Sequence, residues 1–173
     1  GALDQGAMRR ANRLVGNAAR QSVLESVAAG LQLQSQGATV VAVTGATGPL
    51  TVRSASGAAW QAARNTAIAL NDGDVVQLGE PDSGVRSYVA VRGGWLVEPV
   101  LGSTSTDTLA RIGPAALTTG QTLAVGDARD AAAVEAADEN PPALPKAGET
   151  VVLDVVMGPR TDWFTPEAVA LFA

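Results

Sequence analysis

Short apolar runs that end at glycine are the feature that most limits how this chain can fold. The runs either alternate apolar and polar residues or consist of consecutive β-branched residues, and both patterns favour strands over helices. Five such segments are "SVLESVAAGLQLQSQG", "ATVVAVTGATG", "PLTVRSAS", "TAIALNDGDVVQLGE" and "GVRSYVAVRGG". The pattern predicts a mainly β barrel or sandwich with one or two short helices at its rims.

Two segments refine this prediction. Residues 71–74, "NDGD", separate two apolar runs and are a strong turn signal, because glycine supplies a positive φ that Asn and Asp also tolerate. We therefore expect residues 66–80 to form a hairpin. Residues 59–68, "AWQAARNTAI", fit either a helix or an extended segment, and both interpretations stay open at this point.

Residues 1–17 predict a short amphipathic helix that stops at Gly16 and Asn17. The apolar positions at helical spacing are Met8, Ala11, Leu14 and Val15, and the arginines on the other faces are Arg9, Arg10 and Arg13. We interpret these arginines as a solvated face rather than as a binding site.

The C-terminal part of the chain differs in composition from the strand-rich part before it. Residues 131–147 are rich in alanine and acidic residues and then contain three prolines, which predicts a linker. Residues 149–159, "ETVVLDVVMGP", predict another strand, and a helix is expected to begin with Thr165 as N-cap, Pro166 and Glu167. Because the sequence ends about two turns into that helix without a polar tail, we expect a fragment of a longer chain.

Absent residue types limit the chemistry of the chain. It contains no histidine and no cysteine. Ser-His-Asp and Cys-His catalysis and metal sites built from His or thiolate ligands are therefore excluded within it, and no metal site is predicted. Carboxylates, arginines, hydroxyls, lysine and backbone amides remain.

Charge and hydropathy point to the type of partner. The formal charge of −5 without a basic cluster argues against nucleic acid and against an anionic membrane as partners. There is neither a signal-peptide pattern nor an apolar window long enough to span a bilayer. We expect a soluble, cytoplasmic protein.

The polar run "LGSTSTD", residues 101–107, has two interpretations. Ser105, Thr106 and Asp107 fit turn and cap residues that satisfy exposed backbone amides, with Asp107 capping a short following helix. The run also fits a cradle for an anion or an amide, in which Gly102 permits close approach and hydroxyls donate.

Two further groups of residues also have two interpretations each. Arg86, Tyr88 and Arg92 are at even spacing in an alternating segment, so they share one face that either binds a carboxylate or is the wet outer side of a strand. Arg160 and Asp162 follow the last expected strand and either contact a ligand or pair with each other.

Four segments together resemble one protein family: "GALDQGAMRRANRLVGN", "RSYVAVRGGWLVEPVLGSTSTDTLARIG", "QTLAVGD" and "VVMGPRTDWFTPEA". The family is the biotin-dependent carboxyltransferase family, which includes allophanate hydrolase subunit 2, the KipA-like proteins and the C subunit of ATP-hydrolysing 5-oxoprolinase. The resemblance implies a cyclophilin-like β-barrel. It assigns residues 1–130 to a barrel like carboxyltransferase subdomain C, 131–147 to a linker, and 148–173 to the truncated start of a lobe like subdomain D.

The resemblance also implies a function, with three alternatives. The leading one is a subunit of an ATP-dependent complex that opens 5-oxoproline to glutamate, so ATP is an expected cofactor of the complex. The second is the carboxyltransferase, or allophanate hydrolase subunit 2, of urea degradation; it needs biotin, which another domain would carry because the only lysine is Lys146 and no Met-Lys-Met triplet is present. The third is a non-enzymatic, KipA-like antagonist of a kinase inhibitor.

Partners and site residues follow from the same resemblance. The expected partners are a subunit like KipI or allophanate hydrolase subunit 1 and a LamB/YcsF-type subunit. No catalytic acid or base is assigned. The residues expected to bind substrate are Asp4, Arg92, Gly102, Ser103, Ser105, Asp107 and Arg160. Thr104 stands where the family has an arginine, which removes one cation from the expected cradle.

Overall fold

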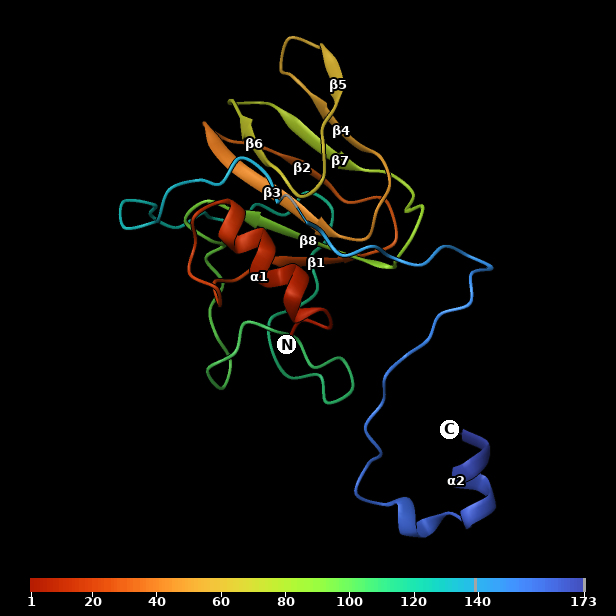
Figure 1. Cartoon of the computed structure of the whole chain (residues 1–173). Helices are drawn as coiled ribbons and strands as arrows, with labels where there is room; N and C mark the ends of the chain where they lie inside the picture. Colours follow the sequence, from red (N-terminus) through yellow and green to blue (C-terminus); the bar gives the residue numbers. More distant parts are fainter. Residues whose placement is uncertain (139, 173) are drawn as a thin grey trace.

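Two antiparallel four-stranded sheets form the body of the protein in a computed structural model that describes residues 1–138 and 140–172 (Figure 1). One sheet has the order β1-β8-β3-β6 and the other the order β2-β7-β4-β5. The strands are β1 (Leu24–Val27), β2 (Gln32–Gln34), β3 (Thr39–Gly45), β4 (Leu50–Arg53), β5 (Ala59–Gln61), β6 (Ala67–Leu70), β7 (Val75–Leu78) and β8 (Arg86–Val91). Two short α-helices, α1 (Gln5–Leu14) and α2 (Pro166–Phe172), and the 3-10 turn η1 (Thr161–Trp163) complete the elements.

The main core lies inside the barrel that the two sheets make. Both sheets contribute Leu, Ile and Val side chains to it, as expected for an aromatic-poor sequence. Trp95, 8% exposed, lies just after β8, and its indole Nε1 donates to the Val89 carbonyl at 3.0 Å. The predictions of a mainly β, cyclophilin-like barrel and of short helices are confirmed.

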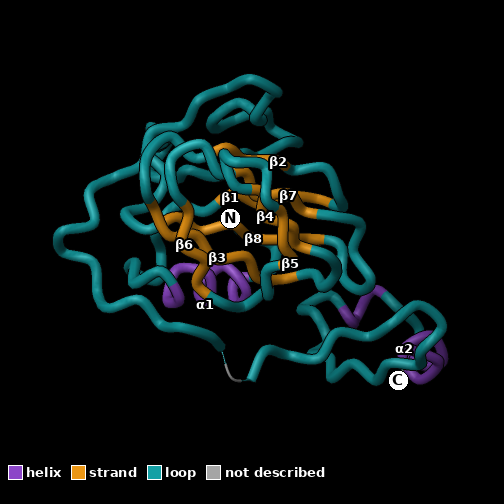
Figure 2. Tube along the Cα trace, turned by 90° about the horizontal axis from the view of Figure 1, so that it is seen from above, coloured by secondary structure: helices purple, strands orange, loops and turns teal. Residues whose placement is uncertain are grey.

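Helix α1 covers the outer face of β3 and β8 (Figure 2). Residues alternate along these strands, so Val41 and Val43 enter the barrel core while Ala42 faces the helix. Small residues on both sides allow close packing, and the buried Thr44 hydroxyl donates to the Ala7 carbonyl at 2.7 Å. The prediction of an amphipathic helix in this region is confirmed.

The turn at residues 71–74 is present, but the predicted hairpin is wrong. Gly73 has φ of 80°, and the Asp74 amide donates to the Asn71 carbonyl at 3.2 Å. The strands on either side of the turn then diverge, since β6 pairs with β3 and β7 pairs with β2 and β4. The turn therefore passes the chain from one sheet to the other. Residues 59–61 are the extended strand β5.

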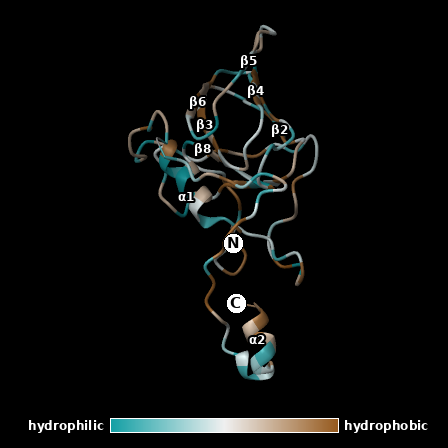
Figure 3. Cartoon of the chain, turned by 45° about the vertical axis from the view of Figure 1, so that its right-hand side comes forward, coloured by the Kyte–Doolittle hydropathy of each residue, from teal (hydrophilic) through white to brown (hydrophobic). Residues whose placement is uncertain are grey.

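The strand expected over residues 149–159 is absent. These residues are extended, and within the described part of the chain they pair with no strand. Val152, Leu153 and Val156 are 89%, 75% and 97% exposed, and Figure 3 colours the segment before α2 as largely hydrophobic. The final helix begins as expected, because Thr165 Oγ1 accepts from the Ala168 amide at 3.3 Å.

Candidate functional site

Gly93 and Gly94 follow the end of strand β8, at two positions where the packing requires glycine. Their φ angles are 92° and 77°, in the left-handed region. A Cβ on Gly93 would lie 2.1 Å from the Gly126 carbonyl oxygen, and one on Gly94 would lie 2.2 Å from Gln21 Nε2. The paired glycines thus let two distant segments of the chain reach the end of the strand.

Side-chain amides connect this strand end to the end of α1. Asn17 Nδ2 donates to the Val91 carbonyl at 2.8 Å, and its Oδ1 accepts from the Gly93 amide at 2.9 Å. Asn12, fully buried, donates through Nδ2 to the Gln21 carbonyl at 2.8 Å. Asn12 and Gln21 organise this contact, and neither was predicted from the sequence. An amide side chain on the apolar face of a predicted helix is the signal that could have identified Asn12.

Arg92 also lies where the end of β8 meets the end of α1. Its Nη1 donates to the Val15 carbonyl at 2.9 Å and to the Ala132 carbonyl at 2.8 Å. The guanidinium therefore joins α1 to the segment that begins at residue 131. Because these two acceptors use one nitrogen, the remaining guanidinium N–H groups stay available for a ligand.

The other residues expected on the Arg92 face have separate roles. Arg86 Nη1 donates to Glu25 Oε1 at 2.6 Å, which forms an ion pair across β8 and β1. Tyr88 is fully buried, and its hydroxyl accepts from the Asp4 amide at 2.8 Å. Burial raises the pKa of Tyr88, and the nearby carboxylates of Glu25 and Asp4 raise it further. Helix α1 therefore covers this face at Tyr88, and the three side chains do not form one open carboxylate-binding surface.

Asp4 is the N-cap of α1. Its Oδ1 accepts from the Ala7 amide at 2.8 Å, which satisfies one of the free amides at the start of the helix. The residue is exposed, so one carboxylate oxygen can still contact a ligand.

The loop after β8 contains residues 101–107, for which the sequence left a cradle and a turn as alternatives, and hydrogen bonds within the loop hold it together. Val100 and Ser103 exchange backbone bonds at 2.8 and 3.0 Å, with Gly102 in the left-handed region between them. Ser103 Oγ accepts from the Ser105 amide at 3.1 Å. Asp107 Oδ1 accepts from the amides of the residues two and three positions later, both at 2.9 Å. These are the turn and cap contacts of the first interpretation, and the short helix expected after Asp107 is absent.

Thr104, where the resemblance implies an arginine, connects the loop to the barrel. Its Oγ1 accepts from Ser22 Oγ at 3.2 Å. The loop side chains are mostly exposed, so hydroxyls and one carboxylate face solvent beside the start of β1.

Arg160 lies away from the barrel. Its guanidinium carbon is 4.3 Å from the centre of the Trp163 ring, a cation–π contact within the C-terminal segment, and no Asp162 ion pair forms among the described residues. The structure thus brings Gly102, Ser103, Ser105 and Asp107 together in one loop. It places Asp4 at one end of α1, Arg92 at the other, and Arg160 in a separate segment (Figure 1).

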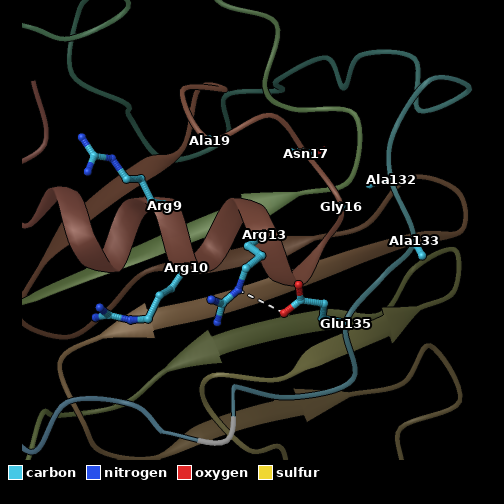
Figure 4. A pocket seen from close by; sticks show the side chains of 9 residues that line it. All are labelled: Arg9, Arg10, Arg13, Gly16, Asn17, Ala19, Ala132, Ala133 and Glu135. Carbon is cyan, nitrogen blue, oxygen red and sulfur yellow. Dashed lines mark ion pairs between the residues drawn. The ribbon is translucent and has the colours of Figure 1, made fainter.

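An open hollow of about 330 Å³ lies beside the second half of α1 (Figure 4). It is lined by Arg9, Arg10, Arg13, Gly16, Asn17, Ala19, Ala132, Ala133 and Glu135. Arg13 Nε lies 3.0 Å from Glu135 Oε2, and the Arg10 side chain is 20% exposed. The prediction of a solvated arginine face therefore fits Arg9 and is wrong for Arg10.

The described residues contain neither a candidate metal-ligand cluster nor a helix that could span a membrane. No group of three or more Asp or Glu there could hold a metal ion. Within the same residues, neither helix is long and apolar enough to cross a membrane.

The sequence profile of the "Carboxyltransferase domain, subdomain A and B" matches residues 1–173. The chain belongs to this family. The family description names subdomains A and B, whereas the resemblance implies subdomains like C and D, and that subdomain assignment stays a prediction.

Named relatives of this carboxyltransferase domain fall into two groups. It is 40% identical over 113 residues to the C subunit of 5-oxoprolinase from Escherichia coli strain K12, which covers 65% of the chain and 35% of that protein. It is 30% identical over 184 residues to urea amidolyase of Saccharomyces cerevisiae, which covers 99% of the chain and 10% of that protein.

Comparison with a solved structure indicates the same family relationship. The urea amidolyase structure from K. lactis has a TM-score of 0.67 and 31% identity over 84% of this chain and 9% of its own chain. The chain thus spans about a third of the length of the 5-oxoprolinase C subunit and about a tenth of the length of urea amidolyase.

Proposed function

We propose that this carboxyltransferase domain acts within the C subunit of an ATP-dependent complex that opens 5-oxoproline to glutamate. The observation that carries the proposal is the 40% identity over 113 residues to a protein named as the C subunit of 5-oxoprolinase. The two long urea amidolyases match at 30%. A subunit needs other subunits, so we propose partners of the KipI-like and LamB/YcsF types and a cytoplasmic location.

The chemistry of the chain suits a binding role within such a complex. A lactam is resonance-stabilised, so opening it requires activation, here by ATP hydrolysis, and stabilisation of developing negative charge. This chain has no histidine, and its candidate groups are Arg92, the loop hydroxyls at residues 103–106, and Asp107. We propose that these groups hold and orient the ring while other subunits supply the phosphoryl chemistry.

ATP itself does not fit the glycine-containing loop of this chain. In the loop at residues 45–48, Arg64 Nε donates to the Gly48 carbonyl and its Nη1 donates to the Ala46 carbonyl, both at 2.9 Å. The Ala46 amide already bonds to Arg86 in β8 and the Thr47 amide to Ser83 in the loop before it, and strand β4 follows where a phosphate-binding loop needs a helix. Burial lowers the pKa of Arg64, and Asp82 partly offsets this. We therefore place ATP on another subunit.

The test uses the protein at the full length that its gene encodes, combined with its two proposed partner subunits. We expect ATP hydrolysis and glutamate release that both depend on 5-oxoproline. Asp107→Ala should lower kcat/KM by about tenfold or more if the carboxylate contacts substrate. Asp72→Ala is the matched control, because Asp72 is also an exposed loop carboxylate that accepts from a backbone amide, that of Gly37 at 2.7 Å.

Each outcome has a distinct meaning. Turnover that is lost in Asp107→Ala and kept in Asp72→Ala supports both the reaction and the loop. Turnover that is kept in both variants supports the reaction and restricts Asp107 to holding the loop. An intact complex without turnover contradicts the proposal.

A carboxyltransferase role is the second candidate, because urea amidolyase aligns with 99% of this chain. Covalent biotin does not fit here: Lys146, the only lysine, lies between Pro145 and Ala147 and not in a Met-Lys-Met triplet. We therefore place biotin on a separate carrier domain. Transfer of a carboxyl group from a carboxybiotin carrier to urea, measured with the same full-length protein, distinguishes this candidate from the first. Binding of a KipI-type partner without either reaction would indicate a regulator.

A further inference from the structure

Residues 131–138 lie on the barrel surface, although the sequence predicted a linker there. We name this segment the strap. Its hydrogen bonds bridge the end of α1 and β6, and β6 is an edge strand of its sheet. The backbone bonds of the strap are Ala132 N to Gly16 O at 2.8 Å, Glu135 N to Leu14 O at 3.0 Å, Ala67 N to Ala136 O at 3.1 Å and Asp138 N to Asn65 O at 2.8 Å.

Ion pairs hold the strap against α1. Arg13 Nε lies 3.0 Å from Glu135 Oε2, and Arg13 Nη2 lies 3.1 Å from Asp138 Oδ1 (Figure 4 shows the Glu135 pair). Arg10 Nε lies 3.7 Å from Asp138 Oδ2. One helical face thus binds both carboxylates of the strap.

Apolar burial contributes little to this attachment. The strap consists mainly of alanine, and its one larger apolar side chain, Val134, is 39% exposed. An alanine methyl buries little apolar area, so the strap depends on hydrogen bonds and charge rather than on the core. The barrel, in contrast, has its own closed core from β1 to Trp95.

The ionic contact is imperfect and partly exposed to salt. Among the described residues, Arg10 Nε and Asp138 Oδ2 are buried without a hydrogen-bond partner, and such atoms weaken a contact. The side chains of Arg13 and Glu135 are 51% and 47% exposed, so dissolved ions screen their attraction. The docked strap is therefore only moderately favoured over a released one.

We propose that the strap is a releasable ionic latch. It detaches as a unit while the barrel stays folded, and its release uncovers the β6 edge, the carbonyls at the end of α1, and Arg10 and Arg13. The strap precedes residues 140–172 in the chain, so the latch determines where the C-terminal segment leaves the barrel. This inference does not depend on the proposed reaction.

Hydrogen exchange of single backbone amides, measured by NMR, tests the latch. The reporters are the amides of Ala67, Ala132, Glu135 and Asp138, compared with the paired amides of β3 and β8. Arg13→Gln removes two of the three ion pairs and should raise exchange at the four reporters by about tenfold without changing the β3 and β8 amides. Arg9→Gln is the matched control, since Arg9 lies on the same helix and bonds only to Gln5 among the described residues, at 3.1 Å.

A second experiment varies the salt concentration. Raising NaCl from about 0.1 M to about 1 M should speed exchange at the four reporters in the wild-type protein and have a smaller effect in Arg13→Gln. The latch is overturned if Arg13→Gln leaves the reporters as protected as β3 and β8. It is also overturned if all amides accelerate together, because the strap would then unfold only with the barrel, or if salt acts equally on both proteins.

Discussion

Gly93 and Gly120 have similar backbone angles but very different surroundings. Their φ values are 92° and 83°, yet a Cβ on Gly93 would meet the Gly126 carbonyl at 2.1 Å and one on Gly120 would meet nothing within 4 Å. Gly120→Ala should cost about 1 kcal/mol of unfolding free energy from backbone strain alone. Gly93→Ala should cost about 3 kcal/mol or more, because the 124–127 segment must also move.

Chemical denaturation of both variants measures this difference. Equal losses would mean that the 124–127 segment adapts without cost, which contradicts the tight packing at the end of β8.

Tyr88 is the only tyrosine, so absorbance reports its ionisation directly. Burial raises its folded-state pKa above the ordinary value of 10.0. The folded protein therefore keeps this proton where the unfolded chain loses it. The associated stability is complete below pH 10.0 and is lost as the pH rises from there through the folded pKa. We expect the free energy of unfolding to fall in that window, and Tyr88→Phe to flatten the fall. A tyrosine that titrates at its ordinary pKa in the folded protein would contradict this.

The roles of single residues were only partly predictable from the sequence. Its alternation correctly grouped Arg86, Tyr88 and Arg92 on one face, because strand periodicity is a local property. The partners of these residues come from segments 40 or more positions away, such as Glu25, Val15 and Ala132. No local pattern contains that information. The substrate-binding role of the predicted residues stays a prediction.

At the scale of elements, α1 gives a test that separates capping from ligand binding. Asp4→Ala removes the acceptor for the Ala7 amide and should cost about 1 kcal/mol of unfolding free energy. Gln5→Ala, next to it on the exposed surface, should cost less than about 0.5 kcal/mol. Thermal or chemical unfolding of the Asp4→Ala and Gln5→Ala variants measures both losses of unfolding free energy. An Asp4→Ala protein as stable as the wild type would show that the cap is dispensable and leave ligand binding as the role of Asp4.

The two elements that the sequence predicted wrongly share a physical cause. The residues 71–74 turn has correct local chemistry, but each strand beside it gains more by pairing within its own sheet, so no hairpin forms. Residues 149–159 have strand-forming composition, yet a strand needs a neighbour, and the described chain provides none. Composition thus predicted the type of backbone and could not predict the pairing. In the region predicted as a linker, residues 131–138 contact α1, and their alanine-rich composition gives no sign of that contact.

At the scale of the whole molecule, the barrel should not need the C-terminal segment. Neither η1 nor α2 contains a buried residue, and the apolar side chains of residues 151–157 are exposed. A chain that ends at residue 147 should keep its free energy of unfolding within about 0.5 kcal/mol. Calorimetry of both chains measures this. A loss of several kcal/mol would mean that residues 148–172 contribute to the barrel core.

The positions of the three tryptophans have a practical consequence for spectroscopy. Trp95 is 8% exposed in the core, Trp60 is 43% exposed on β5, and Trp163 is 70% exposed under the Arg160 guanidinium. Emission from Trp95 should lie toward the blue and that from Trp163 toward the red, since indole fluorescence follows the polarity of its surroundings. The wavelength of emission therefore distinguishes the barrel core from the C-terminal segment. A single denaturation series can follow barrel unfolding at the blue edge and events near the C-terminus at the red edge.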